Sequence, residues 1–305
     1  MCGVFGFITT NGSGPDLARL RRIAAQTQQR GHHAFGLAWL DAQGTIHTFK
    51  RPGPATANLG DLDACRGTTV VIGHCRWATH GRPEDNRNNH PHRAGRGWFV
   101  HNGVVTNHDA LVRRFRLAPQ TECDSEALGL LMARFPGAIG LRAARTAEAA
   151  DGRLVILGVW RNPARLLVVR SGNPLSFGET AGGFYFASLP GELPGRVLSI
   201  TDEYAGVLTY QDGELKHEAF SIERRTMRYL TTTEAASVLH VDPSRVRLLC
   251  KLGRIGTIKI GNTYAISEHE LERFAALPRR AGRPCRNADD SRQAPAKSAT
   301  CISHG

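Results

Sequence analysis

The sequence predicts an α+β fold with antiparallel sheets over about its first 220 residues, followed by a small second module. Three observations support this prediction. The chain opens on a short apolar segment, residues 3–8, which is typical of a buried strand. It then mixes strands with only a few helices, and residues 153–220 form a run of short apolar strands. This order favours layered antiparallel sheets, because a parallel sheet needs strands and helices in regular alternation.

Local patterns predict the remaining elements. Asp16 can cap a helix that runs to about Gln28, because apolar residues recur there at helical spacing. Two further helices are expected at residues 124–135 and 139–149. Strands are expected at residues 34–40, 45–50, 69–73 and 97–100. Later strands are separated by turns at Gly182-Gly183 and Asp212-Gly213.

Composition limits the class of protein. Of the 305 residues, 41% are hydrophobic, which is enough for a sizeable core in one large domain or two. No apolar run reaches the length of a membrane span, and the N-terminus lacks the regions of a signal peptide. Seven cysteines without a CxxC pair are typical of free thiols in a reducing compartment. We therefore expect a cytoplasmic protein that needs no membrane and no cofactor.

Positive charge is concentrated near the C-terminus. The net charge is +12, and residues 224–286 carry 13 Lys or Arg against 5 Asp or Glu, a net of +8. Such a block predicts a module that faces a polyanion, and a solvated basic surface is the plainer alternative.

A cysteine follows the initiator methionine directly. Cys2 is small enough for Met1 to be removed, which would leave one residue with both a thiol and a free α-amine. The thiol titrates near ~8.5 and the amine near ~7.7–8.0, so the amine is partly a free base at neutral pH. This pairing predicts an N-terminal nucleophile that carries its own base. Taken alone, Cys2 fits equally well as a small hydrophobe.

Seven motifs occur in a fixed order along residues 2–222: Cys2-Gly3-Val4-Phe5-Gly6, Arg30-Gly31, Arg76-Trp77-Ala78-Thr79-His80-Gly81, His90-Pro91-His92, His101-Asn102-Gly103, Thr121-Glu122-Cys123-Asp124 and Gly172-Asn173-Pro174-Leu175. Together they resemble the class II, or N-terminal nucleophile, glutamine amidotransferases, and most nearly the glutaminase domain of glucosamine-6-phosphate synthase. The resemblance implies a four-layer α/β/β/α sandwich that hydrolyses the glutamine side-chain amide and releases ammonia.

The same resemblance implies a role for each site residue. Cys2 would attack the amide carbon, while Asn102 and Gly103 would form the oxyanion hole. Arg76 would bind the substrate carboxylate, and Asp124 would bind the substrate ammonium. Trp77, Thr79 and His80 would line the pocket. Without the resemblance, Arg76 is compatible with a surface arginine and Asp124 with a helix cap.

Two features depart from a simple match. The family continues Arg-Gly with an aromatic residue, an aspartate and a serine, whereas His32-His33-Ala34 follow here. No ammonia-accepting domain is visible, which implies a separate acceptor enzyme.

The five histidines at 74, 80, 90, 92 and 101 fit no standard zinc spacing, so no metal site is expected.

Residues 229–277 have the signals of a winged helix-turn-helix domain. Thr231-Thr232-Thr233-Glu234 is a capping box before a short helix at 235–239, and Asp242-Pro243 opens a second helix that runs to Gly253. Two short strands, 257–260 and 263–266, are joined through Gly261-Asn262, and a third helix runs to about Ala276. The pattern resembles the excisionase or MerR-like family. It implies that Arg245, Arg247 and Lys251 on the second helix bind double-stranded DNA.

The sequence thus predicts three regions: a glutaminase domain at 2–222, a DNA-binding domain at 229–277 and a disordered tail at 278–305. The leading function is an amidotransferase that supplies ammonia from glutamine to an unidentified acceptor. A glutamine-sensing DNA-binding regulator with little turnover and a stand-alone γ-glutamyl amidase are the alternatives. The second module is also compatible with a protein-interaction domain, and the chain with an oligomer.

Overall fold

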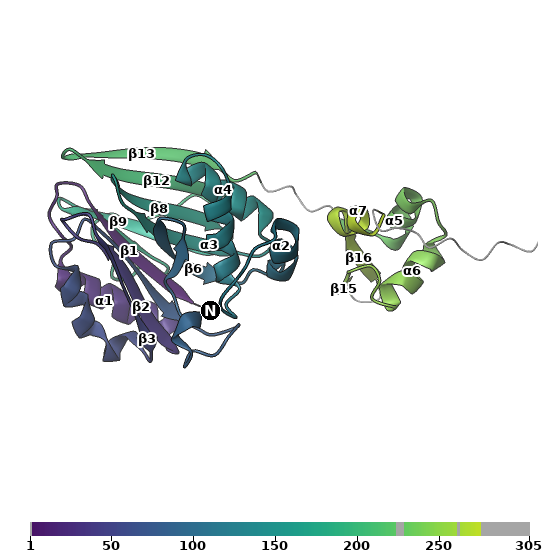
Figure 1. The fold of residues 1–305 in the computed structure, drawn as a ribbon, viewed down its shortest axis with the longest axis horizontal. Helices are drawn as coiled ribbons and strands as arrows, with labels where there is room; N and C mark the ends of the chain where they lie inside the picture. Colours follow the sequence, from purple (N-terminus) through teal and green to yellow (C-terminus); the bar gives the residue numbers. More distant parts are fainter. Residues whose placement is uncertain (1, 224–228, 261–262, 276–305) are drawn as a thin grey trace, which may run out of the picture. The chain divides into compact units, whose positions relative to one another are not determined.

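A computed structural model describes residues 2–223, 229–260 and 263–275. The chain divides into two compact units, residues 1–225 and 226–305 (Figure 1). The predicted Gly261-Asn262 turn and the predicted tail at 278–305 lie outside the described residues. Within the described part of the chain, no helix is long and apolar enough to cross a membrane.

The first unit contains two antiparallel sheets. The seven-stranded sheet has the order β11-β9-β10-β1-β4-β2-β3. Its strands are β1 (Gly3–Thr9), β2 (Ala34–Leu40), β3 (Ile46–Pro52), β4 (Val70–Arg76), β9 (Ser176–Thr180), β10 (Gly183–Ala187) and β11 (Leu198–Ser199). The six-stranded sheet has the order β13-β12-β8-β7-β6-β5. Its strands are β5 (His92–Ala94), β6 (Gly97–Gly103), β7 (Leu154–Trp160), β8 (Ala164–Ser171), β12 (Tyr204–Gln211) and β13 (Glu214–Ser221).

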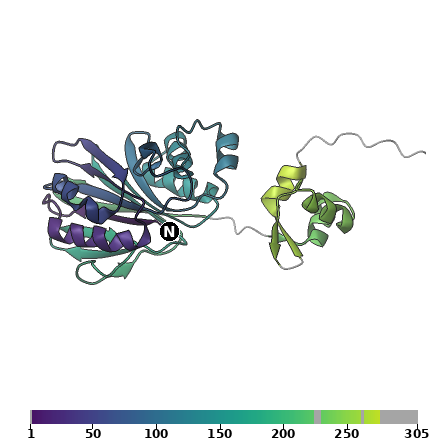
Figure 2. The ribbon, with the colours of Figure 1, turned by 90° about the horizontal axis from the view of Figure 1, so that it is seen from below.

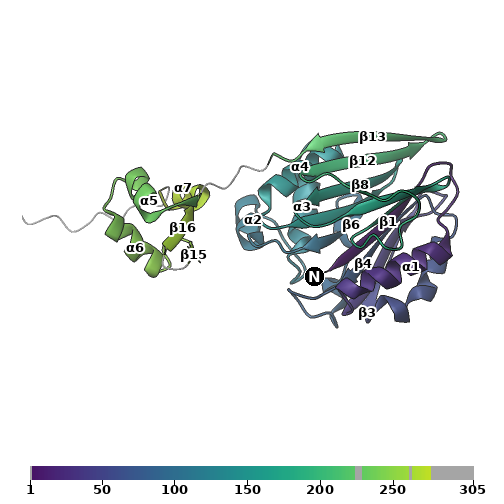
Figure 3. The same ribbon diagram turned by 180° about the vertical axis from the view of Figure 1, so that it is seen from behind.

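Helices cover the outer face of each sheet, which gives four layers (Figures 1 and 3). α1 (Leu17–Thr27), with the 3-10 segment Leu59–Cys65, packs on the seven-stranded sheet. α3 (Ser125–Arg134) and α4 (Ile139–Ala149) pack on the six-stranded sheet. Figure 2 shows α1 (purple) and the teal helices on opposite sides of the strands. The predicted α/β/β/α sandwich is confirmed.

Both faces of β1 are buried, each against a different core. Side chains of a strand point alternately to opposite faces. Val4 and Ile8 pack between the sheets with Leu157 of β7, whereas Phe5 and Phe7 pack under α1. The central strand therefore reads as a continuous apolar run, and it fixes Cys2 at one end of the sandwich.

Several local predictions agree with the structure. Asp16 caps α1, because its carboxylate accepts hydrogen bonds from the N–H groups of Ala18 and Arg19. Asp212 and Gly213 have φ values of +54° and +82°, as a tight hairpin turn between β12 and β13 requires. The helix α2 (His108–Phe115) and the short strand β5 were not predicted.

In the second unit, residues 229–260 and 263–275 form three helices and a three-stranded sheet of order β14-β16-β15. Its elements are β14 (Tyr229–Leu230), α5 (Thr232–Leu239), α6 (Pro243–Lys251), β15 (Ile258–Ile260), β16 (Thr263–Ser267) and α7 (Glu268–Ala275). The predicted capping box is present, with Thr231 and Glu234 bonded to each other's backbone N–H. α5 is three residues longer than predicted, since it begins at Thr232.

Candidate active site

The Cys2 thiol lies beside the peptide that follows β4. The Trp77 N–H donates to the Cys2 sulfur across 3.3 Å, and the Arg30 side chain donates to the Cys2 carbonyl across 2.8 Å. Burial raises the pKa of the thiol, and the Trp77 hydrogen bond and the Arg76 charge oppose that rise. The nearby Asp124 carboxylate raises it further. The thiol is therefore held in its neutral form, and it needs a base to become a nucleophile.

Gly31 of the Arg30-Gly31 motif lies against the Arg76–Trp77 peptide that contacts the Cys2 sulfur. A Cβ added to Gly31 would lie 2.4 Å from the Arg76 carbonyl carbon and 2.6 Å from the Trp77 nitrogen. Real side chains do not tolerate such contacts, so only glycine lets the two backbones approach this closely. Gly31 therefore allows the Trp77 N–H to face the sulfur.

The His32-His33 departure forms a cluster with Trp77. The ring centroids of His32 and His33 lie 5.2 Å and 4.9 Å from that of Trp77. The Ala78 N–H donates to Nδ1 of His33 across 3.0 Å, so this nitrogen is unprotonated. Burial and the neighbouring His32 lower the pKa of His33, which agrees with that role. His33 thus holds the backbone of the segment that follows Arg76, and His32 packs against the same tryptophan ring.

Asn102 and Gly103 end β6 on the facing sheet. Asn102 is fully buried, and its amide lies 3.5 Å from the Ser188 hydroxyl, which accepts the Val4 N–H across 3.1 Å. Its side-chain oxygen has no partner among the described residues. Asn173 donates to the Asn102 carbonyl across 3.0 Å. Ser188 was not predicted as a site residue, and Asn173 was predicted only as part of a motif.

Arg76 is buried, and its guanidinium already holds the following loop. It donates to the Asn89 side chain across 2.7 Å, to the Gly81 carbonyl across 3.1 Å and to the His80 carbonyl. Three of its five N–H donors are thus committed. The remaining two do not share one edge of the guanidinium plane, so a two-point contact of Arg76 with a carboxylate requires one of these bonds to rearrange.

Asp124 is buried at the start of α3 but does not cap the helix through its side chain. One carboxylate oxygen accepts the Val105 N–H across 2.7 Å, and the other lies 3.8 Å from Nδ1 of His80. The second oxygen remains open to a further donor. Trp77 and Thr79 are exposed on the loop after β4, so they lie at the rim of the site.

The structure brings together a metal-capable group that histidine spacing does not reveal. Ligand atoms of His90, His92 and Cys123 lie within 4.8 Å of one another, and all three residues are buried. Burial lowers the pKa of His92 to about 3 and raises that of Cys123 to about 11. These donors suit a soft metal ion in principle, but Lys50 and Arg76 place positive charge beside them. We assign no metal-dependent step to this group.

In the second unit, Arg245, Arg247 and Lys251 are all exposed on α6. At about 100° per residue, Arg247 and Lys251 lie on one side of the helix, and Arg245 is roughly 120–160° away from them. Leu248, 44% exposed, lies next to Lys251 on the same side. The helix therefore presents two cations and one apolar side chain together.

Comparisons with known proteins agree with both units. The family model described as "Helix-turn-helix domain" matches residues 229–276. The glutamine–fructose-6-phosphate aminotransferase of Chlorobaculum tepidum is 35% identical over 207 residues, which cover 62% of this chain and 32% of that protein. The Shigella flexneri protein of the same name is 33% identical, over 91% of this chain and 53% of that protein. A glutamine phosphoribosylpyrophosphate amidotransferase structure from B. subtilis shares the fold, with a TM-score of 0.60 at 23% identity over 77% of this chain and 52% of that one.

The first unit is related in sequence to these glutamine–fructose-6-phosphate aminotransferases and is called the amidotransferase domain below, and residues 229–276 match the helix-turn-helix model. It spans about half or less of the length of these curated relatives. The amidotransferase domain contains Cys2, Arg76 and Asp124, and the helix-turn-helix domain contains α6.

Buried histidines make the stability of the amidotransferase domain depend on pH. Burial lowers the pKa of His101 to about 4, that of His92 to about 3, and those of His74 and His90 well below the usual value. The unfolded chain takes up these protons near pH ~6.5, so the folded state loses stability as pH falls below that value. Urea unfolding at pH 7 and pH 5.5 should differ by about 1 kcal/mol for each such histidine. Equal unfolding free energies at the two pH values would contradict neutral burial.

Gly31→Ala tests whether this glycine positions the Trp77 N–H beside the Cys2 thiol. The added Cβ must push the Arg76–Trp77 peptide away, which should weaken the hydrogen bond to sulfur, slow alkylation of Cys2 by iodoacetamide and destabilise the fold by about 1–3 kcal/mol. Gly60→Ala is the matched control, because a Cβ there meets nothing within 4 Å. Similar alkylation rates for the two variants would rule out the role given to Gly31.

Proposed function

We propose that residues 2–222 hydrolyse the side-chain amide of glutamine with the Cys2 thiol as nucleophile. The observation that supports this most is the position of the sulfur, which the Trp77 N–H holds within the field of both Arg76 and Asp124. One positive and one negative side chain beside a nucleophile match the carboxylate and ammonium of a free amino acid. The names of the relatives also include glutamine as a substrate.

In this proposal the α-amine of Cys2, free once Met1 is removed, takes the thiol proton. The sulfur attacks the amide carbon, and the C–N bond breaks as the amine returns the proton to the leaving ammonia. Water then hydrolyses the thioester to glutamate. Asn102, through its side-chain N–H, and Gly103, through its backbone N–H, stabilise the oxyanion. Trp77, Thr79 and His80 form the rim of the pocket.

The released ammonia passes to a separate acceptor enzyme, and residues 229–277 bind double-stranded DNA through α6. A second candidate is a glutamine-sensing regulator, which the neutral thiol and the helix-turn-helix domain favour. Turnover separates the two. Purified protein, with loss of Met1 confirmed by mass spectrometry, should release ammonia and glutamate in equal amounts, whereas a sensor would bind glutamine with little release.

Cys2→Ala should abolish ammonia release and leave the fold intact, since the thiol is the nucleophile. A glutamine-analogue electrophile should label Cys2 in the wild-type protein and no other cysteine. Cys75 and Cys123 are the informative controls, because both are buried and burial raises the pKa of each thiol. Labelling of either one in the Cys2→Ala protein would refute the assignment of the nucleophile.

Asp124→Asn separates substrate binding from catalysis. The amide keeps an oxygen that can accept the Val105 N–H, but it removes the charge proposed to bind the substrate ammonium. We expect a large rise in KM, from a loss of about 2–5 kcal/mol for a buried charge pair.

Asn102→Ala, which removes an oxyanion donor, should instead lower kcat by roughly 10²–10³-fold. Steady-state kinetics on both variants provides the comparison. An Asp124→Asn protein with an unchanged KM would remove this residue from the site.

Arg247→Ala/Lys251→Ala should weaken duplex binding. Each lost phosphate contact reduces the slope of log K against log salt by about 0.9, so the double variant should lose about two units. Arg113→Ala/Arg134→Ala removes two exposed charges from the amidotransferase domain and is the matched control. A chain ending at Glu223 should keep glutaminase activity and lose DNA binding. If the double variant and its control bind duplexes equally well, the protein-interaction alternative replaces the DNA-binding one.

A further inference from the structure

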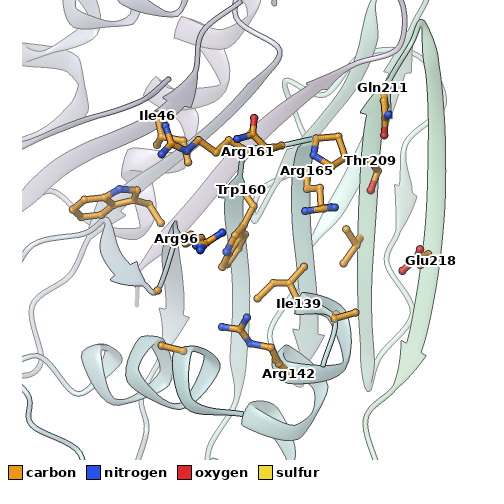
Figure 4. Close-up of a pocket in the computed structure, with 18 of the residues that line it drawn as sticks. Ile46, Arg96, Ile139, Arg142, Trp160, Arg161, Arg165, Thr209, Gln211 and Glu218 are labelled. Carbon is orange, nitrogen blue, oxygen red and sulfur yellow. The ribbon is translucent and has the colours of Figure 1, made fainter. Parts of the chain in front are cut away.

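A cavity of about 1310 Å³ lies beside α4 over the outer face of the six-stranded sheet, and its lining extends around the strand ends to Thr45 and Ile46 at the start of β3 (Figure 4). Arg165 of β8 pairs in register with Thr209 of β12, and both line it. Leu167, two residues after Arg165, packs in the core under the helices. Alternate residues of a strand share a face, so Arg165 points to the same side of the sheet as the helices. At this position α4 does not cover the sheet.

The cavity lies at the opposite end of the strands from Cys2. β6 places Trp98 in the cavity wall and Asn102 at the active site, four residues further along. At about 3.3 Å per residue, this corresponds to roughly 13 Å along the strand. β7 likewise ends at the cavity with Trp160, whereas Leu154 at its start pairs with Gly103. The cavity is therefore separate from the proposed glutaminase site.

Six cationic side chains line this cavity, which we call the arginine pocket: Arg93, Arg96, Arg142, Arg161, Arg165 and Lys216. Glu218 is the one carboxylate in its lining, so the formal charge is +5. Across the described ranges, the ion pairs include none of the five arginines. Figure 4 shows Arg96 beside Trp160, Arg161 extending toward Ile46, and Arg142 and Arg165 on the neighbouring helix and strand.

The five arginines come from three segments, the β5–β6 hairpin, α4 and the β7–β8 hairpin, so the packing of these segments brings them together. Arg142 of α4 reaches the β5–β6 turn, where a Cβ added to Gly95 would lie 3.8 Å from its Nη2. Its Nε donates to the Met132 carbonyl, which fixes the side chain. Burial lowers the pKa of Arg142, as expected for a cation with no carboxylate beside it. Gathering such charges costs free energy that a bound anion would offset.

We propose that the arginine pocket binds a small molecule that carries two or more phosphate groups. Guanidinium groups bind phosphate through paired N–H donors, and a net charge of +5 complements a diphosphate or triphosphate. The volume is of the order of ligand-binding cavities, and Trp98 and Ile46 supply an apolar wall for the rest of the molecule. A concave site fits a small molecule better than the convex backbone of a duplex.

The test uses the full-length protein and three probes at low ionic strength: inorganic pyrophosphate, ATP and a DNA duplex. Calorimetric titration should show saturable binding of pyrophosphate or ATP. Arg161→Gln/Arg165→Gln removes two pocket charges that form no hydrogen bond or ion pair in the described part of the chain, and should weaken this binding at least about tenfold. Arg113→Gln/Arg114→Gln removes the same charge from the exposed face of α2, away from the lining, and should change it less than about twofold.

Three results would overturn the proposal. One is no binding of pyrophosphate or ATP, and another is equal weakening by the two double variants, which would indicate a general effect of net charge. The third is a loss of duplex binding, but not of ATP binding, in Arg161→Gln/Arg165→Gln. Glutaminase activity provides an independent readout, because a failure of the proposed glutaminase would leave these titrations unaffected.

Discussion

The hydrogen bond between the Trp77 N–H and the Cys2 sulfur depends on the register of two antiparallel strands. β1 begins where β4 ends, with Gly3 opposite Cys75. The residue before β1 therefore meets the residues after β4. A shift of one residue would also turn Val4 and Ile8 away from the inter-sheet core, so hydrophobic burial fixes the position of the Cys2 thiol.

The parts of the fold that the sequence predicts well are those set by local chemistry. The Asp16 cap, the Thr231 capping box and the Asp212-Gly213 turn each need only a few adjacent residues. α2 was missed because it is an eight-residue helix in which only Leu111 is buried. Short elements of this kind depend on the surface they pack against, which a local pattern does not contain.

In the candidate site too, local motifs predict some residues but not the partners they contact. Motif order identified Arg76 and Asp124, but their partners come from distant segments: Asn89 for Arg76 and Val105 for Asp124. Ser188 contacts Val4 from 184 residues away. Such contacts follow from sheet order and not from spacing along the chain. In the arginine pocket, Arg142 of α4 and Lys216 of β13 are far in sequence from the two hairpins that carry the other four cations. Only the packing of helix and sheet brings them together, so no local pattern predicts the pocket.

The second unit has a hydrophobic core of its own, with buried residues that run from Leu230 to Leu271. The side chains of this core therefore need no complementary surface on the first unit when the two are joined in one gene. Recombination between residues 223 and 229 would join two segments that each retain their internal contacts. The first unit could in this way acquire a new binding partner during evolution without any change to its interior.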